Sequence, residues 1–456
     1  MAIAADSVAQ SLVKKITAVD AQRLPEVVRG RAEELLLDIA GLCVAARRAD
    51  YVQAVLKSWE GAGPCTAFGH VGSFDAATAA MINGTAAHGE DFDDTFEGGP
   101  VHAGAVIIPA VLAACERYQR DGSAALLGIV VGCETMCRLS IVAPKMVHRA
   151  GFHPTSVFGT LAAAAAVSAT LGLDEEQQVN ALGIAGSMAS GIIEYLSTGA
   201  WTKRMHPGWA AQAGLRAALM AQQGFVGPHL VLEGTHGVFN GFAHTTDANY
   251  HALTEDFGKR WLMETIAFKP YACGTMIHPY IDCALKLAAQ GTPIDDIDEI
   301  VCETAEGIVH RLWEPLALKQ RPPNAYAAKF SVPFCIASAF VTGDAGLGAF
   351  TEAAVRDPRL LTLAAKVRYE VDPHNPYPKN YTGHIQVTLR DGRRFETRQP
   401  HLRGGAQERL TQAELEAKFT RNAEIGGWPA ELAAALRDYA STVFDAPSID
   451  LAMFAR

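Results

Sequence analysis

Three apolar stretches rich in alanine and glycine constrain the fold of this chain more than any other feature. They lie at about residues 103–119, 124–141 and 155–171. Each is long enough for several helical turns, and small residues on several faces let helix backbones approach one another closely. We therefore expect these three helices at the centre of an all-helical body.

Further helices are predicted before and after this group. Pro25 suits the first position of a helix, and apolar residues follow it at helical spacing from Val28 to Cys43. A helix at about 174–188 opens on three acidic residues, which the helix dipole favours there. One more helix runs from Pro207 to Gly224. The first half of the chain is thus helix after helix.

The pattern changes near residue 260. Residues 297–305, 366–372 and 384–399 alternate in the manner of strands, and Asp391-Gly392 inside the last run is a strong hairpin signal. Helical patterns begin at His278 and Ser331 between these runs. The region is predicted to be a smaller α+β unit.

After about residue 400 the chain turns helical again, with a capping box at Thr411-x-x-Glu414 and a helix at about 429–440. The predicted fold class is mainly α. A large all-helical domain built from both chain ends, residues 1–266 and 400–456, carries an inserted α+β lid domain over residues 267–399.

Bulk composition narrows the classes of partner. The 456-residue chain has a formal charge of −10, which disfavours nucleic acid or an anionic membrane as a partner. Residues 1–15 lack a signal-peptide pattern, and the apolar runs 103–115 and 161–173 are shorter than the ~20 residues of a membrane span. None of the nine cysteines forms a CxxC pair. We expect a reduced, cytoplasmic protein without a disulfide or zinc framework.

The stretch AAHGEDFDDTFEGGPVHAGAVIIPA, residues 86–110, gathers charge against an apolar helix. Five carboxylates lie between His88 and His102: Glu90, Asp91, Asp93, Asp94 and Glu97. A metal site, an acid/base site and a solvated turn are all compatible with this pattern. If residues 88–95 continue the helix, His88, Asp91 and Thr95 share an arc of roughly 60–100°, and Asp93 points almost the other way.

The metal interpretation depends on Asp93-Asp94-Thr95-Phe96-Glu97, the DDxxE pattern of magnesium-dependent prenyl-diphosphate enzymes. Those enzymes need a second acidic motif on a facing helix, and the sequence contains none, so we predict no metal. GxGxxG, GxxxxGK[ST], GxSxG and HExxH are absent as well. A cysteine nucleophile at Cys273 is possible but has no distinctive flank.

Three more stretches carry groups that can act on acids. GFHPTSVFGT places His153 before a proline at a helix start, and WTKRMHPGW holds Lys203, Arg204 and His206. Surface salt bridging is one interpretation of this basic segment; binding of a carboxylate substrate is the other. FKPYACGTMIHPYIDCAL holds Lys269, Cys273 and His278 at the junction of the two regions, where a cleft would form.

These stretches, in this order, resemble the MmgE/PrpD family of 2-methylcitrate dehydratase, cis-aconitate decarboxylase and iminodisuccinate epimerase. The likeness is carried by NGTAAHGEDFDDT, HAGAVIIPAVLA, FHPTSVFGTLAAAAAVSATLGL, NALGIAGSMASGI, TKRMHPGWAAQAGL, QQGFVGP and FKPYACGTMIHPYIDCAL. The resemblance implies a homodimer that works without metal or organic cofactor. It also implies small di- or tricarboxylate substrates.

Matching the family motifs position by position gives the candidate site. The resemblance implies that Asp91, His102, His153 and Lys203 are catalytic, and that Thr95 and Lys269 bind substrate. His206 and Cys273 join the substrate-binding set because they lie in the same two motifs. Lysines can stabilise charge that builds on a substrate carboxylate, and histidines can move a proton near neutral pH.

The chain departs from the decarboxylase branch at two lid positions. That branch has a further His and Tyr, where this sequence has Gly274 and Phe334. The expected function is therefore a lyase that dehydrates a 2-methylcitrate-like hydroxy acid. The alternatives are an epimerase of an iminodisuccinate-like acid, a cis-aconitate-type decarboxylase, a magnesium-dependent prenyl-diphosphate enzyme and a carboxylate-binding protein without activity.

Overall fold

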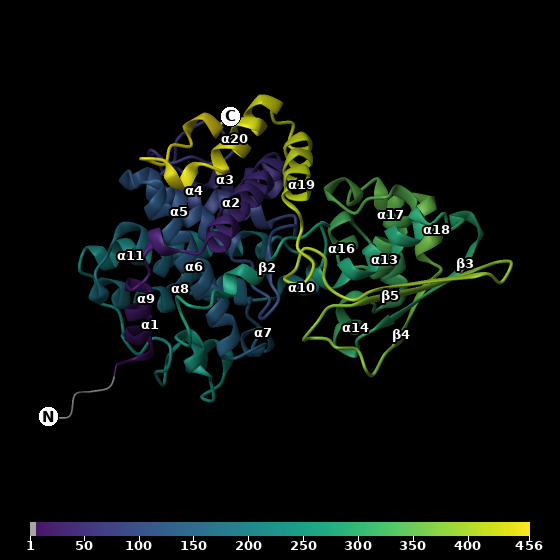
Figure 1. The fold of residues 1–456 in the computed structure, drawn as a ribbon, viewed down its shortest axis with the longest axis horizontal. Coiled ribbons are helices and arrows are strands. Elements are labelled where there is room, and N and C mark those ends of the chain that lie inside the picture. The colour runs from purple at the N-terminus through teal and green to yellow at the C-terminus, as the bar shows by residue number, and fades with distance from the viewer. Residues whose placement is uncertain (1–5) are drawn as a thin grey trace. The chain divides into compact units, whose positions relative to one another are not determined.

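The structure, a computed structural model, describes residues 6–456 and contains two compact units (Figure 1). Unit 1 comprises the chain up to Gly89, residues 93–266 and residues 412–456; unit 2 comprises residues 90–92 and 267–411. Helices dominate, so the mainly α class is confirmed. The signal-peptide expectation also covers residues 1–5, which lie outside the described residues.

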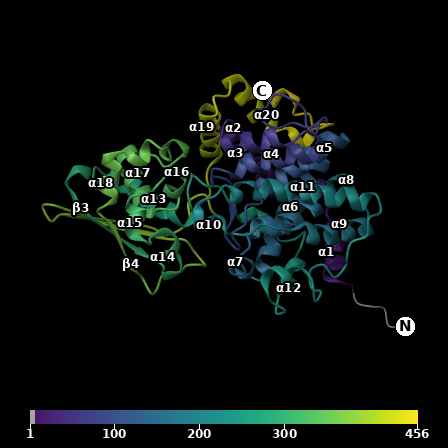
Figure 2. The ribbon, with the colours of Figure 1, turned by 180° about the vertical axis from the view of Figure 1, so that it is seen from behind.

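Unit 1 is built from helices drawn from both ends of the chain (Figures 1 and 2). The predicted central helices are confirmed as α5, α6 and α8. Its elements are α1 (Val8–Thr17), α2 (Glu26–Ala46), α3 (Asp50–Ser58), α4 (Ala76–His88), β1 (Thr95–Phe96), α5 (Gly104–Tyr118), α6 (Gly122–Val142), α7 (Met146–Arg149), α8 (Pro154–Leu171), α9 (Glu175–Met188), α10 (Tyr195–Thr198), α11 (Thr202–Gln222), α12 (Val238–Ala243), α19 (Gln412–Ile425) and α20 (Ala430–Ala440).

Two of these helices, α6 and α8, are long and apolar enough by length and composition to cross a membrane. A bent pair in unit 2, Val332–Thr342 with Leu347–Arg356, passes the same test. The apolar runs at 103–115 and 161–173 therefore understated the length of the apolar helices. In both α6 and α8, 89% of the apolar window is buried by packing against the rest of the chain. Burial in a helical core accounts for this apolarity without a bilayer.

The crossing of α4 and α11 brings two backbones into direct contact. A Cβ added at Gly84 would lie 2.6 Å from the Cα of Gly208, and one added at Gly208 would lie 2.2 Å from the carbonyl oxygen of Met81. Only glycine leaves room for this approach. His88 lies one turn after Gly84, and His206 lies two residues before Gly208. The contact therefore brings the end of α4 close to the first turns of α11.

The C-terminal segment packs on the N-terminal part of unit 1. The ring of Phe419 in α19 packs against Gly41 in α2, and a Cβ added at Gly41 would lie only 2.7 Å from Cδ2 of Phe419. The buried ammonium of Lys418 lies 2.6 Å from the carboxylate of Asp38 in α2. Breaking one partner of such a buried pair is strongly destabilising, so these residues fix α19 to α2.

Unit 2 is an α+β unit with a four-stranded sheet of order β4-β3-β5-β6. Strand β3 pairs in parallel with β4 and antiparallel with β5, and β5 and β6 form the predicted hairpin with Gly392 at φ +86°. The elements are β2 (Ile266–Ala267), whose first residue closes unit 1, α13 (His278–Ala289), β3 (Ile297–Thr304), α14 (Glu306–Leu312), α15 (Leu316–Gln320), α16 (Ala325–Ala328), α17 (Val332–Thr342), α18 (Pro358–Ala364), β4 (Val367–Val371), β5 (Gly383–Leu389) and β6 (Arg394–Gln399).

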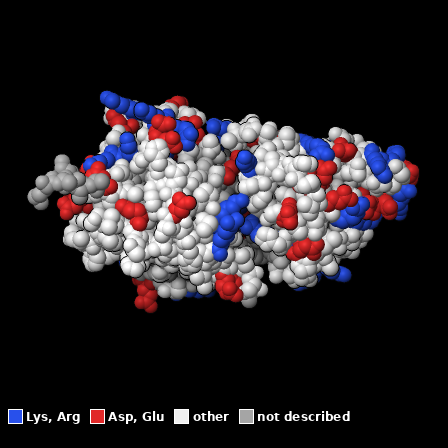
Figure 3. All heavy atoms as spheres, turned by 90° about the horizontal axis from the view of Figure 1, so that it is seen from below, with Lys and Arg blue, Asp and Glu red and all other residues white. Residues whose placement is uncertain are grey.

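Alternation sets which face of the sheet is covered. Ile385, Val387 and Leu389 of β5 are buried, and α13 packs on β5 and β6. Charged partners such as Glu303 and Arg398, 2.7 Å apart, lie on the strands as well. Figure 3 shows acidic and basic side chains interspersed on unit 2. On this face neither sign of charge forms a patch of its own.

Residues 400–411 belong to unit 2 by their contacts, although the sequence pattern placed the return to the helical domain at residue 400. The amide of Phe268 donates to the carbonyl of Gly404 over 3.0 Å. Arg403 donates to the hydroxyl of Tyr271 over 3.2 Å. The first and last segments of unit 2 are therefore tied to each other.

Gly208→Ala should destabilise the protein by about 1–3 kcal/mol, because the added methyl group overpacks the α4–α11 contact. Urea denaturation followed by circular dichroism measures the change in the free energy of unfolding. Gly30→Ala in α2 is the matched control, since nothing lies within 4 Å of its added Cβ. That control should be neutral or gain up to about 1 kcal/mol. Equal effects of the two substitutions would contradict the packing argument.

Candidate active site

Four histidines of unit 1 occupy helix ends and gather into one cluster. His88 is the last residue of α4, His102 precedes α5, His153 is the N-cap of α8 and His206 lies in the second turn of α11. All four are buried, with 1% to 8% of their surface exposed. The ring centres of His88 and His102 are 4.8 Å apart, and those of His88 and His153 are 5.7 Å apart. The predicted residues His102, His153 and His206 are thus brought together.

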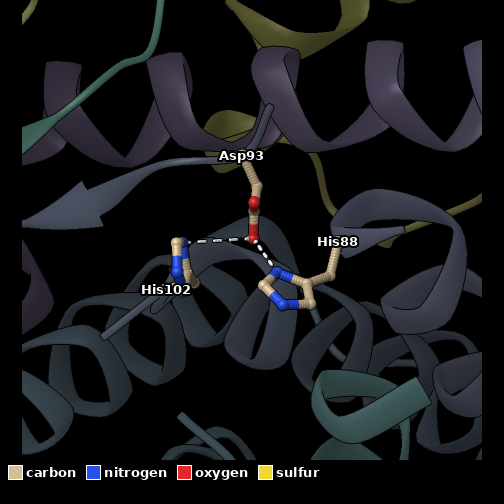
Figure 4. A group of neighbouring side chains, drawn as sticks. All are labelled: His88, Asp93 and His102. Carbon is tan, nitrogen blue, oxygen red and sulfur yellow. Dashed lines mark hydrogen bonds and ion pairs between the residues drawn. The ribbon is translucent and has the colours of Figure 1, made fainter. Parts of the chain in front are cut away.

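The imidazole of His88 forms its hydrogen bond with Asp93, not with Asp91. Its Nδ1 lies 2.6 Å from Oδ2 of Asp93, and both side chains are fully buried (Figure 4). The helical arc that placed His88, Asp91 and Thr95 on one face is wrong, because α4 ends at His88. The chain turns sharply after Gly89, with Asp91 at φ +56°, and returns Asp93 to the imidazole.

Asp94 holds the start of α5. Its two carboxylate oxygens accept the amides of Ala103 and Gly104, each over 3.0 Å. Its backbone carbonyl lies 2.6 Å from Nδ1 of His102. Burial, with the charge of Asp93 next, raises the pKa of Asp94 to about 8. One residue therefore caps the helix and positions the imidazole ahead of it.

This burial also decides between the interpretations of the acidic stretch. Asp91, Asp93 and Asp94 are all buried, so the solvated-turn interpretation is wrong for them. The DDxxE pattern lies outside any helix: Asp93 and Asp94 precede β1, and Glu97 follows it. Its two aspartates contact His88 and the N-terminus of α5. They therefore do not line a helix face in the way the prenyl-diphosphate interpretation requires.

His153 and His206 form a second pair. Their Nδ1 atoms are 3.1 Å apart, so one ring donates a hydrogen and the other accepts it. Burial, assisted by the charges of neighbouring histidines and Lys203, holds the pKa of His153 well below its usual range. Burial, then the charges of His88 and Lys203, lowers the pKa of His206 to about 4. Both rings are neutral at physiological pH.

Lys203 and Arg204 have different neighbours at the start of α11. The charge of Lys203 helps to lower the pKa values of His153 and His206. The guanidinium of Arg204 instead lies over the ring of Tyr51, 4.3 Å from its centre. Lys203 and His206 of this basic segment therefore belong with the histidine cluster, whereas Arg204 contacts Tyr51.

Asp91 and Lys269 lie together within unit 2. The ammonium of Lys269 donates to the backbone carbonyl of Asp91 over 2.8 Å and lies 3.6 Å from its carboxylate. Lys329 does the same for the preceding residue, with 2.8 Å to the carbonyl of Glu90 and 3.0 Å to its carboxylate. Both lysines are 2% exposed. Sequence reasoning missed Lys329, because a single lysine between alanine and phenylalanine carries no motif.

Comparison with known proteins identifies the family. Residues 10–251 match the model of the MmgE/PrpD N-terminal domain, and residues 271–435 match that of the MmgE/PrpD C-terminal domain. The chain belongs to the MmgE/PrpD family. The resemblance seen in the sequence motifs is thereby confirmed.

Several curated relatives of this MmgE/PrpD protein carry names of one activity. It is 32% identical over 363 residues to cis-aconitate decarboxylase of Homo sapiens, covering 76% of this chain and 72% of that protein. It is 29% identical over 369 residues to cis-aconitate decarboxylase of Aspergillus terreus, covering 75% and 74%. The cis-aconitate decarboxylase-like protein oryM of Aspergillus oryzae is 27% identical over 415 residues, covering 86% and 85%.

The remaining predicted residues of this MmgE/PrpD chain are buried. Cys273 has no exposed surface, and burial, with Cys335 nearby, raises the pKa of its thiol well above the usual range. A neutral thiol is a poor nucleophile, so the structure argues against the Cys273 nucleophile. Thr95 is 3% exposed in β1. Its role and that of Cys273 in substrate binding stay predictions.

Among residues 6–456, the group with donor atoms close enough for a metal ion is His88, Asp93 and His102, with these atoms within 4.8 Å of one another. Imidazole and carboxylate are ligands that transition metals accept. However, the Nδ1 atoms of both rings lie 2.6 Å from oxygen acceptors, a distance that places a hydrogen between them. We therefore describe this group of the MmgE/PrpD site as a hydrogen-bonded, proton-sharing cluster.

The buried neutral His206 should make the protein less stable in acid. In the folded state the pKa of His206 is about 4, against an ordinary value of 6.5. Between pH 4 and pH 6.5 the unfolded chain therefore binds a proton at this residue that the folded chain does not bind. Stability should fall as pH drops from 6.5 to 4, with up to about 3 kcal/mol from this group.

Urea denaturation of wild type and His206→Asn across this pH range measures the contribution, and the substitution should flatten the pH dependence. The exposed His251 supplies the control, and His251→Asn should keep the wild-type slope. An unchanged slope in His206→Asn would show that folding does not lower the pKa of His206.

Proposed function

We propose that this chain is a lyase that acts on a small di- or tricarboxylate by moving a proton at a carbon next to a carboxylate. One observation carries the proposal: four buried imidazoles gather in unit 1, two of them facing the buried carboxylate of Asp93, with the charge of Lys203 acting on the other two. Buried titratable groups with strongly displaced pKa values are typical of sites that transfer protons. The names of the curated relatives support the lyase class.

His102 is well placed to act as the base. A carbonyl oxygen only accepts, so the 2.6 Å contact with Asp94 means that Nδ1 of His102 carries the hydrogen. In the neutral ring the lone pair then lies on Nε2. This nitrogen can take the substrate proton while the fixed Nδ1–H bond holds the ring in orientation.

The reaction follows from where the electrons go. The proton moves from carbon to Nε2, and the electrons of the C–H bond move onto the adjoining carboxylate as an enolate. They then form the C=C bond as hydroxide leaves from the next carbon. An imidazolium of the cluster returns a proton to the hydroxide, and water is lost. A nearby ammonium such as that of Lys203 stabilises the enolate charge.

Dehydration of a 2-methylcitrate-like hydroxy acid is the specific reaction that we propose. The reason lies at residues 274 and 334, where the decarboxylase branch carries His and Tyr. Gly274 has no side chain, and Phe334 is a fully buried apolar residue. Neither can donate a proton. Decarboxylation of cis-aconitate is the second candidate, because the curated relatives bear that name. Epimerisation would use the same proton abstraction without a leaving group.

Incubation of the purified protein with 2-methylcitrate, citrate, cis-aconitate and iminodisuccinate in D₂O, followed by proton NMR, tests these reactions. Dehydration should give an alkene proton from citrate and should turn the methyl doublet of 2-methylcitrate into a singlet. Decarboxylation should give a new terminal methylene group, and epimerisation should exchange the C–H proton for deuterium. Excess EDTA should leave the rate unchanged; loss of activity would favour a metal mechanism. Tight binding of one acid without turnover or exchange would favour a carboxylate-binding protein.

His102→Gln should lower kcat/KM about 10²–10⁴-fold, because glutamine keeps a hydrogen-bonding amide but cannot take the proton. Lys203→Ala should lower it about 10²–10³-fold through loss of charge stabilisation. The exposed Lys57 at the end of α3 provides the control, and Lys57→Ala should keep wild-type kinetics. Near wild-type activity in both site variants would refute the assignments.

A further inference from the structure

A single carboxylate oxygen of Asp93 faces two imidazoles. Oδ2 lies 2.6 Å from Nδ1 of His88 and 3.6 Å from Nδ1 of His102 (Figure 4). The carboxylate comes from the loop between α4 and β1, so it is separate in sequence from the histidine that precedes α5. The side chain of Asp93 is fully buried, which makes its charge act strongly on both rings.

The hydrogen-bond acceptors near His88 and His102 determine which ring nitrogen carries the hydrogen in each. An ionised carboxylate accepts, so Nδ1 of His88 donates to Asp93. Nδ1 of His102 donates to the carbonyl of Asp94, and the Asp93 oxygen lies 3.6 Å from the same nitrogen. Both rings therefore turn the same nitrogen toward the acidic loop. A proton added to either ring at Nε2 makes an imidazolium next to the Asp93 charge.

The other two histidines face each other. His153 and His206 share one hydrogen between their Nδ1 atoms, and the nearby charges that lower their pKa values are all positive. His88 acts on both of them, as does Lys203. Further titratable groups here are Asp94, which is buried beside Asp93 with its own pKa raised, and Tyr195, whose ring centre is 5.8 Å from that of His206. The charge of Asp38 and the thiol of Cys133 interact in turn with Asp94.

We propose that Asp93 is the positioning residue of this site: its shared carboxylate favours a proton on His88 or His102, and so divides the four imidazoles into a pair that takes up the proton and a pair that stays neutral. This inference builds on the proton-transfer site in the proposed function and adds a division of roles. His88 and His102 carry the mobile proton. His153 and His206 stay neutral and can hydrogen-bond substrate.

The division predicts shifts of opposite sign when Asp93 is removed. In Asp93→Asn, the pKa values of His88 and His102 should fall by about one unit or more, since their charged forms lose a partner. The pKa values of His153 and His206 should rise, because the positive charge of His88 that opposes them is lost. A change in packing alone has no reason to move the two pairs in opposite directions.

Histidine side-chain ¹⁵N NMR of the whole protein, titrated with pH, measures all four rings and their tautomers without any substrate. Glu134→Gln is the matched control: it neutralises a fully buried carboxylate that is paired 2.6 Å from Arg138. That variant should lose stability but leave the four titrations in place. His88→Gln is the second variant, and it should raise the pKa values of His153 and His206 even if Asp93→Asn does not fold.

Opposite shifts in Asp93→Asn, or the rise in His88→Gln, support the division of the cluster. Shifts of all four rings in one direction in Asp93→Asn, or unchanged titrations in both variants, overturn it. Since the titration needs no turnover, failure of the proposed function would appear only in the substrate assays. Where a substrate is found, the pH profile of kcat/KM in Asp93→Asn should move its acidic limb to lower pH.

Discussion

The close approach of Gly84 and Gly208 is the contact on which the site depends. It removes side chains from the crossing of α4 and α11, so the two backbones meet directly. His88 and His206 lie within about one turn of that crossing on their respective helices, and the histidines that precede α5 and α8 complete the group. Backbone packing is stiff, so a crossing fixed in this way can hold the imidazoles of α4 and α11 in place.

Burial gives these groups their chemistry. A buried charge is costly unless it is paired, and here Asp93 faces two imidazoles while Asp94 accepts two amides at the start of α5. The same burial keeps His153 and His206 neutral. A structure that needed only stability would replace such a network with apolar side chains at little loss, so its presence argues for use in catalysis.

The sequence predicted the parts that depend on local periodicity and missed those that depend on chain reversal. Alanine-rich helices, alternating strands and the Asp391-Gly392 hairpin each leave a local pattern, and each is confirmed. The end of α4 at His88 leaves none, because the turn depends on a positive φ at Asp91, an aspartate that resembles its neighbours in the sequence. Because of that turn, the partner of His88 is Asp93 and not Asp91. Lys329 was missed because its contact with Glu90 joins residues 239 positions apart.

Membership in the MmgE/PrpD family points to the proton abstraction that starts the reaction, but it does not select the product. Dehydration, decarboxylation and epimerisation all pass through negative charge on a carbon beside a carboxylate, so one histidine cluster can serve each. The outcome depends on which bond breaks next and where a second proton is delivered. The chain keeps the imidazoles and Lys203 of unit 1, and its departures from the decarboxylase branch, Gly274 and Phe334, fall in unit 2. In the proposed function, the base and the choice of product are therefore encoded in different parts of the sequence, which would allow relatives to share one while differing in the other.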